Sequence, residues 1–281
     1  MLFPQNIGAY LSIDELSLSK GELYTFVTNK KGKGKQGTLV AVINGTLSKD
    51  IIDTLMKLSA DKRLQVKEVT LDMAKNMELA VKQVFTNATL VTDRFHVIKL
   101  AMEALQHSRV NLRWQALDKE NEAIKQAKEQ QIKYEPTVLE NGETPKQLLA
   151  RSKYILAKKP NDWTANQIQR AALLFKHFPT LQTDYHHTLD FRNIYENTNK
   201  DTAKIAFEKW IDKINEAGMK HFYTVANTVK YNLDNILNFF NNRNTNANAE
   251  SFNSKIKLFR ANIRGVTDTK FFLFRLYKLF A

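Results

Sequence analysis

The chain has 281 residues, of which 43% are hydrophobic and 25% charged, a composition typical of a globular protein and not of a disordered or fibrous one. Lysine and arginine number 42 against 29 acidic residues, giving a formal charge of +13 that should attract polyanions such as nucleic acid or an acidic membrane surface. The absence of cysteine excludes disulfides, a thiolate zinc site and a cysteine nucleophile. Without a signal peptide or a membrane-length apolar run, a cytoplasmic protein is expected.

The first hundred residues alternate strand-like and helix-like patterns. Strands are expected at residues 7–14, 23–28, 38–43, 66–71 and 88–92, and helices at 48–58 and 73–84. The alternation at 7–14 predicts a first strand that is buried on one face and ends at Asp14. Hairpins followed by a strand–helix–strand crossover predict an α/β fold with a mixed five-stranded sheet.

From about Arg94 to Phe240 the strand pattern disappears, and helix formers dominate. Prolines divide this stretch into separate helices because proline is poorly tolerated inside a helix. We interpret the three tryptophans of this stretch, Trp114, Trp163 and Trp210, as core anchors. The asparagine-rich run 241–246 predicts a loop, and a last helical region is expected from near Ala249.

Acidic residues follow three of the expected strands. Asp14, Asp72 and Asp93 should therefore gather at one part of the sheet. Clustered carboxylates suit Mg²⁺ or Mn²⁺, and paired ions of this kind support in-line phosphoryl transfer. Glu250 is the candidate for a further acid, because it begins a helix and shares a face with Asn253 and Lys257.

Two basic segments stand out beside these acids. The loop 30–37 carries four lysines and three glycines but lacks the pattern of a phosphate-binding P-loop. It is equally consistent with a cationic hairpin that touches a DNA backbone and with a solvated turn. The C-terminal basic residues include Lys255, Lys257, Arg260 and Arg264, for which phosphate contact near the acids is expected.

Four phrases carry a resemblance to a known family: SIDE at 12–15, VTLDM at 69–73, VTDRFHVIK at 91–99 and AESFNSKIK at 249–257. In this order they resemble the motifs of bacterial insertion-sequence transposases of the ISL-three type. The order of strands and acids likewise looks like the ribonuclease-H-like core of DDE transposases. The resemblance implies a core in residues 1–100 and 245–281, interrupted by an all-helical insertion at 101–244.

The resemblance also implies site residues. Asp14, Asp72 and Glu250 match the metal-binding triad, while Asp93 and His96 match an adjacent structural or catalytic support. Asp93 also competes with Asp72 for the place of the second acid, because the phrase around it is the more family-specific. The local positive charge, and not the resemblance, makes Lys255, Lys257, Arg260 and Arg264 expected DNA contacts. Arg94 could pair with Asp93 or hold a phosphate, and the basic setting favours the phosphate.

The activity implied is Mg²⁺- or Mn²⁺-dependent DNA strand cleavage and strand transfer. The implied partners are the element ends, target DNA and a second or further copy of the chain. Members of the family carry zinc-binding and helix-turn-helix segments ahead of the core, which this sequence lacks. The alternatives are therefore a DNA-binding remnant that does not transpose, or a metal-dependent nuclease.

Overall fold

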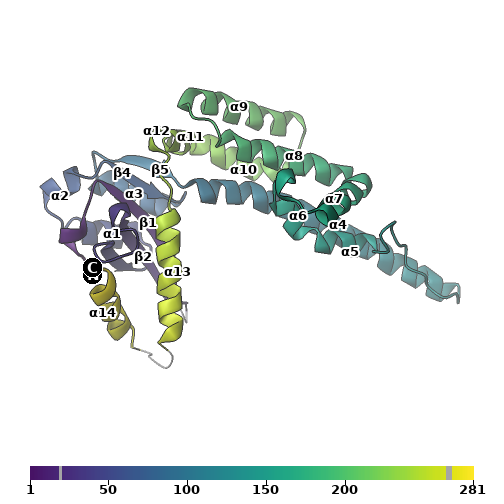
Figure 1. Ribbon diagram of the computed structural model, residues 1–281, viewed down its shortest axis with the longest axis horizontal. Helices are drawn as coiled ribbons and strands as arrows, with labels where there is room; N and C mark the ends of the chain where they lie inside the picture. The colour runs from purple at the N-terminus through teal and green to yellow at the C-terminus, as the bar shows by residue number, and fades with distance from the viewer. Residues whose placement is uncertain (19–20, 264–267) are drawn as a thin grey trace. The chain divides into compact units, whose positions relative to one another are not determined.

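The computed structural model describes residues 1–18, 21–263 and 268–281. They divide into two compact units, one formed by Met1–Val97 with Asn232–Ala281 and the other by Ile98–Tyr231. We call the first the sheet unit and the second the helical unit (Figure 1).

The sheet unit is built on a mixed sheet. Its strands are β1 (Tyr10–Ser17), β2 (Leu23–Asn29), β3 (Leu39–Asn44), β4 (Glu68–Leu71) and β5 (Thr89–Thr92), in the spatial order β3-β2-β1-β4-β5. β2 is antiparallel to both β1 and β3, whereas β1, β4 and β5 run parallel. This confirms the expected α/β fold, and the strand order is consistent with a ribonuclease-H-like core.

The first strand differs from the expectation in two respects. β1 does not end at Asp14 but continues to Ser17, because its last residues stay paired with β2. It is also covered on both faces: Leu11 and Ile13 belong to one hydrophobic cluster and Leu16 to another. The alternating pattern predicted only one buried face. The second face is covered by a helix from the far end of the chain, which a local pattern cannot indicate.

Helices cover both faces of the sheet. One cluster joins Ile51 and Leu55 of α1 (Ser48–Leu55) and Val81 of α3 (Lys75–Val84) to Leu11 and Ile13. The other cluster contains residues of α13 (Ala247–Asn262) and α14 (Thr269–Phe280). Three short helices complete this unit: α2 (Ala60–Leu64), α11 (Leu233–Leu237) and α12 (Phe239–Asn242). Figure 1 shows α13 running beside β1 and β2, and the two elements β1 and α13 are in contact.

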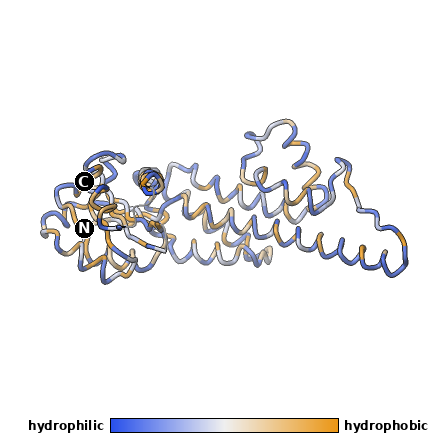
Figure 2. Tube along the Cα trace, turned by 90° about the horizontal axis from the view of Figure 1, so that it is seen from below, coloured by the Kyte–Doolittle hydropathy of each residue, from blue (hydrophilic) through white to orange (hydrophobic). Residues whose placement is uncertain are grey.

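The helical unit confirms the expectation of an all-helical region. Its helices are α4 (Arg94–Glu129), whose first residues belong to the sheet unit, α5 (Pro145–Arg151), α6 (Lys153–Ala157), α7 (Ala165–His177), α8 (Pro179–Ile194), α9 (Lys200–Glu216) and α10 (Lys220–Tyr231). Pro145 and Pro179 occupy first turns, where a missing N–H costs nothing. Orange and blue alternate along these helices in Figure 2, as expected for helices with one buried face.

The three tryptophans differ in burial. Trp210 is buried and lies 4.6 Å from Phe191 between ring centroids, and Trp163 stacks on Tyr185 at 5.6 Å. Trp114, however, is 58% exposed on α4, so its interpretation as a core anchor is wrong.

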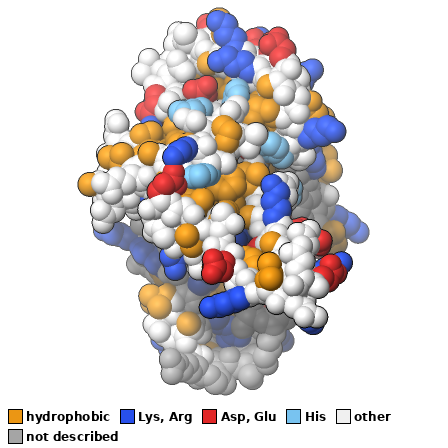
Figure 3. Space-filling view, turned by 90° about the vertical axis from the view of Figure 1, so that its right-hand side faces the viewer, with side chains coloured by type: hydrophobic (Ala, Val, Ile, Leu, Met, Phe, Trp, Pro, Cys, Tyr) orange, Lys and Arg blue, Asp and Glu red, His pale blue; other side chains and the backbone are white. Residues whose placement is uncertain are grey.

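On the face shown in Figure 3, basic side chains are interspersed with acidic, histidine and hydrophobic ones. Among the described residues, no helix combines the length and apolar character needed to cross a bilayer.

Candidate active site

Three aspartates lie next to one another across the parallel strands. The register pairs Ser12 with Thr70, and Asp14 and Asp72 each follow two residues later. Asp72 and Asp93 are the residues directly after β4 and β5, and the Asp93 amide donates to the Leu71 carbonyl at 2.8 Å. Because parallel strands present the same end at the same edge, the sheet topology brings these carboxylates together.

Asp14 is half-buried and hydrogen-bonded through both oxygens. Its Oδ1 accepts from the Glu15 amide at 2.9 Å, and its Oδ2 accepts from Asn253 Nδ2 at 2.7 Å. Burial raises the pKa of Asp14 from its ordinary value of 3.8 to about 6; Asp72 and Asp93 add to the rise, while the Glu15 amide and His96 oppose it. Burial is thus the main reason that Asp14 holds its proton more tightly than an exposed aspartate.

Asp93, His96 and Glu250 form a tight group, in which one ligand atom from each residue lies within 4.8 Å of the others. Asp93 is only 1% exposed. Its Oδ2 accepts from His96 Nδ1 at 3.1 Å, so Nδ1 carries the proton. This bond is the main cause that raises the pKa of His96, with the negative charges of Asp93, Asp14 and Asp72 acting in the same direction.

Glu250 has one side-chain oxygen without a hydrogen-bond partner among the described residues. Burial raises its pKa, and the negative charge of Asp93 adds to the rise. Its Oε1 atom is buried and makes no hydrogen bond with any described residue. A buried carboxylate oxygen without a donor is costly, and it is the kind of atom that a cation would satisfy.

Asp72 is held differently. Its Oδ1 accepts from the Ala74 amide at 2.8 Å, at the start of α3. Its Oδ2 receives no hydrogen bond in the described part of the chain. Glu15 is a further carboxylate near Asp72 that the sequence pattern did not indicate. Burial raises the pKa of Glu15, and the negative charge of Asp72 adds to the rise.

An asparagine-rich segment positions Glu250. The Asn246 amide donates to Asp93 Oδ1 at 3.0 Å, and the Asn246 carbonyl accepts from the Glu250 amide at 2.8 Å. Asn242 and Asn244 donate to the two oxygens of Glu68, a carboxylate that is only 3% exposed. The expected loop is thus tied down on the polar part of the sheet face, and it leads directly into α13.

Apolar packing supports the same placement of α13. Phe252 and Ile256 are buried in the cluster that also contains Leu16, Phe26 and Phe272. Glu250 and Asn253 lie on the helix face that points to the acids, since Asn253 reaches Asp14 and Glu250 reaches the group of Asp93.

The residues expected to contact DNA have different surroundings in the structure. The guanidinium carbon of Arg94 lies 5.6 Å from the centroid of the Phe239 ring, and that of Arg260 lies 5.0 Å from the centroid of the Phe272 ring. Lys255 donates to the Gly34 carbonyl at 3.3 Å, which brings α13 to the lysine-rich turn, and Lys257 is exposed. Arg264 lies outside the described residues.

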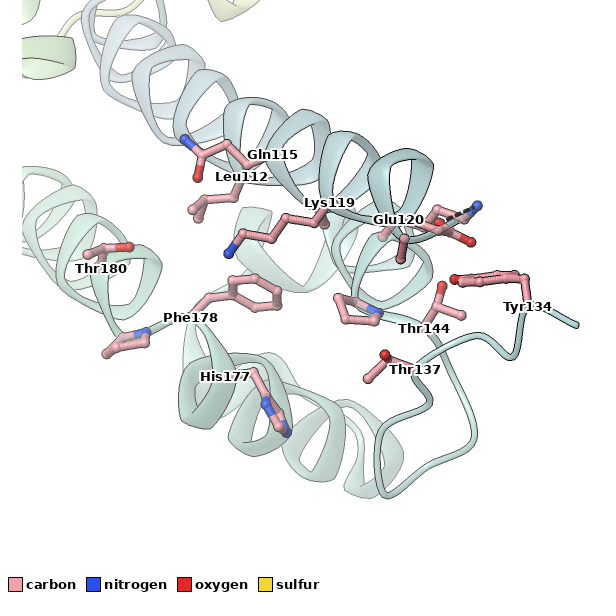
Figure 4. A pocket seen from close by; sticks show the side chains of 15 residues that line it. Leu112, Gln115, Lys119, Glu120, Tyr134, Thr137, Thr144, His177, Phe178 and Thr180 are labelled. Carbon is pink, nitrogen blue, oxygen red and sulfur yellow. Dashed lines mark ion pairs between the residues drawn. The ribbon is translucent and has the colours of Figure 1, made fainter. Parts of the chain in front are cut away.

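A cavity of about 440 Å³ in the helical unit has different chemistry (Figure 4). Lys119 of α4 points into it, and Glu120 forms an ion pair with Lys146 at 2.6 Å. Glu120 is the only carboxylate lining it among the described residues, so it offers no acid cluster comparable to that of the sheet unit.

The fold and the acids define a class of protein: an α/β core with acids on or after adjacent strands of a mixed sheet. A family model for DDE transposases of the ISL-three type, described as "Transposase", matches residues 11–276. The chain belongs to this transposase family. It is 22% identical, over 274 residues, to the transposase for insertion sequence element IS1001 of Bordetella parapertussis, covering 96% of this chain and 61% of that protein. The chain thus spans about three-fifths of the length of that curated relative.

Proposed function

We propose that the sheet unit carries out metal-dependent DNA strand cleavage and strand transfer at the ends of an insertion sequence. The observation that supports this most is the convergence of Asp14, Asp72 and Asp93 from three parallel strands with Glu250 from a helix far away in the sequence. Together with membership of the transposase family, this convergence favours phosphoryl transfer on DNA over other reactions of an acidic site.

The side chains fit a hard divalent cation. We propose Asp14, Asp72 and Glu250 as the ligands, because they offer carboxylate oxygens, which Mg²⁺ and Mn²⁺ prefer. The buried Oε1 of Glu250, which has no hydrogen-bond partner among the described residues, supports this choice, because a cation would satisfy such an atom. When bound, paired ions of this kind activate water or a 3′-hydroxyl and stabilise the attacking and leaving oxygens.

Asp93 and His96 act as supports in this proposal. Both Asp93 oxygens already accept hydrogen bonds, one from the Asn246 amide and one from His96. Asp93 therefore holds the start of α13, and with it Glu250, in place. His96 partly balances the negative charge around Asp14. The competing ligand set is Asp93, His96 and Glu250, whose ligand atoms lie within 4.8 Å of one another.

The proposed partners are DNA and further copies of the chain. The charge of +13 supports a polyanionic substrate, and Arg94, Lys255, Lys257, Arg260 and Arg264 are proposed to contact phosphates near the acids. Joining two element ends requires two active sites, which favours a dimer or higher oligomer on DNA. Residues 101–244 are proposed as the insertion between the two parts of the catalytic core.

The experiment is cleavage and joining of end-labelled DNA by the purified chain with Mg²⁺ or Mn²⁺. Asp14→Asn and Glu250→Gln should abolish both products, whereas Asp53→Asn, which changes an exposed aspartate of α1, should abolish neither. Nicks without joined products would reduce the function to that of a nuclease. DNA binding without any metal-dependent cleavage would leave a non-transposing remnant as the better account.

A further inference from the structure

An open cleft of about 540 Å³ lies on the sheet unit, lined by Tyr10, the Lys30–Lys31 turn and residues 242–245. We propose that this cleft holds the backbone of a DNA strand that continues from the acid site, with a base stacked on Tyr10. The inference rests on the proposed function and adds to it the place where the substrate strand is held.

The charge of the cleft is one-sided. Its lining contains Lys30, Lys31 and Arg243, and no acidic residue among those described. The Lys30 ammonium is used internally, since it pairs with the buried Glu68 at 3.3 Å and also donates to Thr70. Lys31 and Arg243 are both exposed and add positive charge that a phosphodiester backbone would meet.

The wall of the cleft is fixed before any ligand arrives. Asn242 and Asn244 are anchored at 3.1 and 2.8 Å on the two oxygens of Glu68. Arg243 between them has a left-handed backbone with φ of 54°, and its guanidinium lies 5.4 Å from the centroid of the buried Phe239 ring. A wall that is already ordered loses little conformational entropy on binding, which favours affinity.

Two contacts link the cleft segment to the acid site. Arg94, which follows Asp93, and Arg243 of the cleft both lie over the Phe239 ring. At the other end of the segment, the Asn246 amide, one residue after Thr245 of the cleft, donates to Asp93. The cleft segment is therefore held beside Asp93.

Tyr10 lies on the same strand as Asp14. The two residues are four positions apart on β1, or about 13 Å at roughly 3.3 Å per residue, so a short oligonucleotide can span the distance from the acids to the cleft. Tyr10 is 41% exposed at the cleft, and an exposed aromatic ring is a platform on which any base can stack.

Binding of a short fluorescein-labelled single-stranded oligonucleotide, in EDTA and at several salt concentrations, tests the proposal. The test variant is Lys31→Gln/Arg243→Asn, because asparagine tolerates the left-handed backbone at position 243. Because two cationic side chains no longer meet phosphates in this variant, affinity should fall about tenfold, and the slope of log K against log salt should shrink by about 1.4. Tyr10→Ala should weaken binding and Tyr10→Phe should not.

The matched control is Lys49→Gln/Lys57→Gln, which removes two exposed charges from the α1 side of the sheet. It should change affinity and slope much less. Equal losses of affinity in the two double variants would overturn the proposal, because they would show only the effect of net charge. If Arg243→Asn perturbs the fold, as checked by circular dichroism, Lys31→Gln against Lys49→Gln gives the same comparison.

A cross-link provides a second, independent readout. Because the chain has no cysteine, Lys31→Cys and Lys49→Cys each introduce a single thiol, which can be offered an oligonucleotide with a tethered disulfide. Cross-linking at position 31 well above that at 49 supports the cleft, and equal yields contradict it. Neither readout involves metal or cleavage. A protein that does not cleave DNA but still binds the oligonucleotide through the cleft would therefore contradict the proposed function and not the proposed cleft.

Discussion

Asn253 donates a 2.7 Å hydrogen bond from its Nδ2 atom to Oδ2 of Asp14, across 239 residues of sequence. This bond ties α13 to the central strand β1. Glu250 lies one helical turn before Asn253 on the same face, and so it is brought to the acids. The position of the last acid thus depends on a neutral side chain that binds the first.

Replacing Asn253 by alanine should therefore affect both stability and activity. The loss of a hydrogen bond to a partly buried carboxylate should cost about 1.5–3 kcal/mol in the free energy of unfolding. A displaced Glu250 should lower cleavage by about 100-fold, as small misplacements in active sites do. Urea unfolding and the cleavage assay measure the two effects. Ser251→Ala, at an exposed position of the same helix, should change both only slightly, and an equally large loss there would contradict the role of Asn253.

Stability of the metal-free protein should depend on pH through Asp14. Its pKa of about 6 in the folded state exceeds the ordinary 3.8, so the folded protein takes up a proton before the unfolded chain does. The free energy of unfolding should therefore rise as pH falls from 7 through 6 towards 4, by at most about 3 kcal/mol. His96, whose pKa is also raised, adds stability at low pH that is lost as pH rises through its folded-state pKa.

Urea unfolding in EDTA at several pH values measures this dependence. Asp14→Asn should flatten the profile between pH 4 and 7, while His96→Gln should remove the part contributed by the imidazole. A profile for Asp14→Asn that parallels the wild type would show that Asp14 titrates normally in the folded protein.

The sheet was predictable because its signals are local. Alternation, turns and the crossover at 48–92 determine which strands neighbour one another, and three short phrases place an acid on or after β1, β4 and β5. The end of β1 was not predictable, because pairing with β2 carries the strand past Asp14 to Ser17. Nor was the burial of its second face, which needs Phe252 and Ile256 from α13.

The polar contacts that position the candidate site gave no sequence signal. Lys30 stood in a lysine-rich turn expected to be solvated or to touch DNA, but its ammonium is buried against Glu68. Glu68 looked like an ordinary charge at the start of a strand, but it anchors Asn242 and Asn244. These contacts join residues that are distant in the sequence. Each residue alone is of a polar or charged type that usually lies on the surface, so the sequence does not indicate its burial.

The Glu68 cluster leads to a prediction about stability. Burial lowers the pKa of Lys30, and Glu68 is its main opposing influence. Glu68→Ala would leave the buried ammonium and two asparagine amides without their acceptor, at a cost of about 3–5 kcal/mol. Lys30→Met/Glu68→Leu should recover much of that loss, because it removes both charges. Urea unfolding of the wild type, Glu68→Ala and Lys30→Met/Glu68→Leu measures these differences. A loss well below about 3 kcal/mol in Glu68→Ala would contradict the prediction and show that water replaces the carboxylate.

The remaining question at the site is whether Asp72 or Asp93 binds metal. Asp72 has an oxygen that receives no hydrogen bond from any described residue, whereas both oxygens of Asp93 are occupied by Asn246 and His96. Asp93 nevertheless lies closer to Glu250, within the 4.8 Å group. A free oxygen favours Asp72 as the ligand, and proximity favours Asp93. We predict that Asp72 is the ligand.

Cysteine substitution separates the two roles, because the chain has no other thiol. A thiolate is a soft ligand that holds Mg²⁺ poorly and transition metals better. Asp72→Cys should therefore be inactive with Mg²⁺ and regain part of its cleavage with Mn²⁺, without a large change in the free energy of unfolding. Asp93→Cys should lose stability, since the Asn246 amide and His96 lose their buried acceptor, and Mn²⁺ should restore no more of its activity than Mg²⁺ does. Rescue by Mn²⁺ at position 93 and not at 72 would transfer the second ligand to Asp93, and Asp72 would then only accept the hydrogen bond from the Ala74 amide ahead of α3.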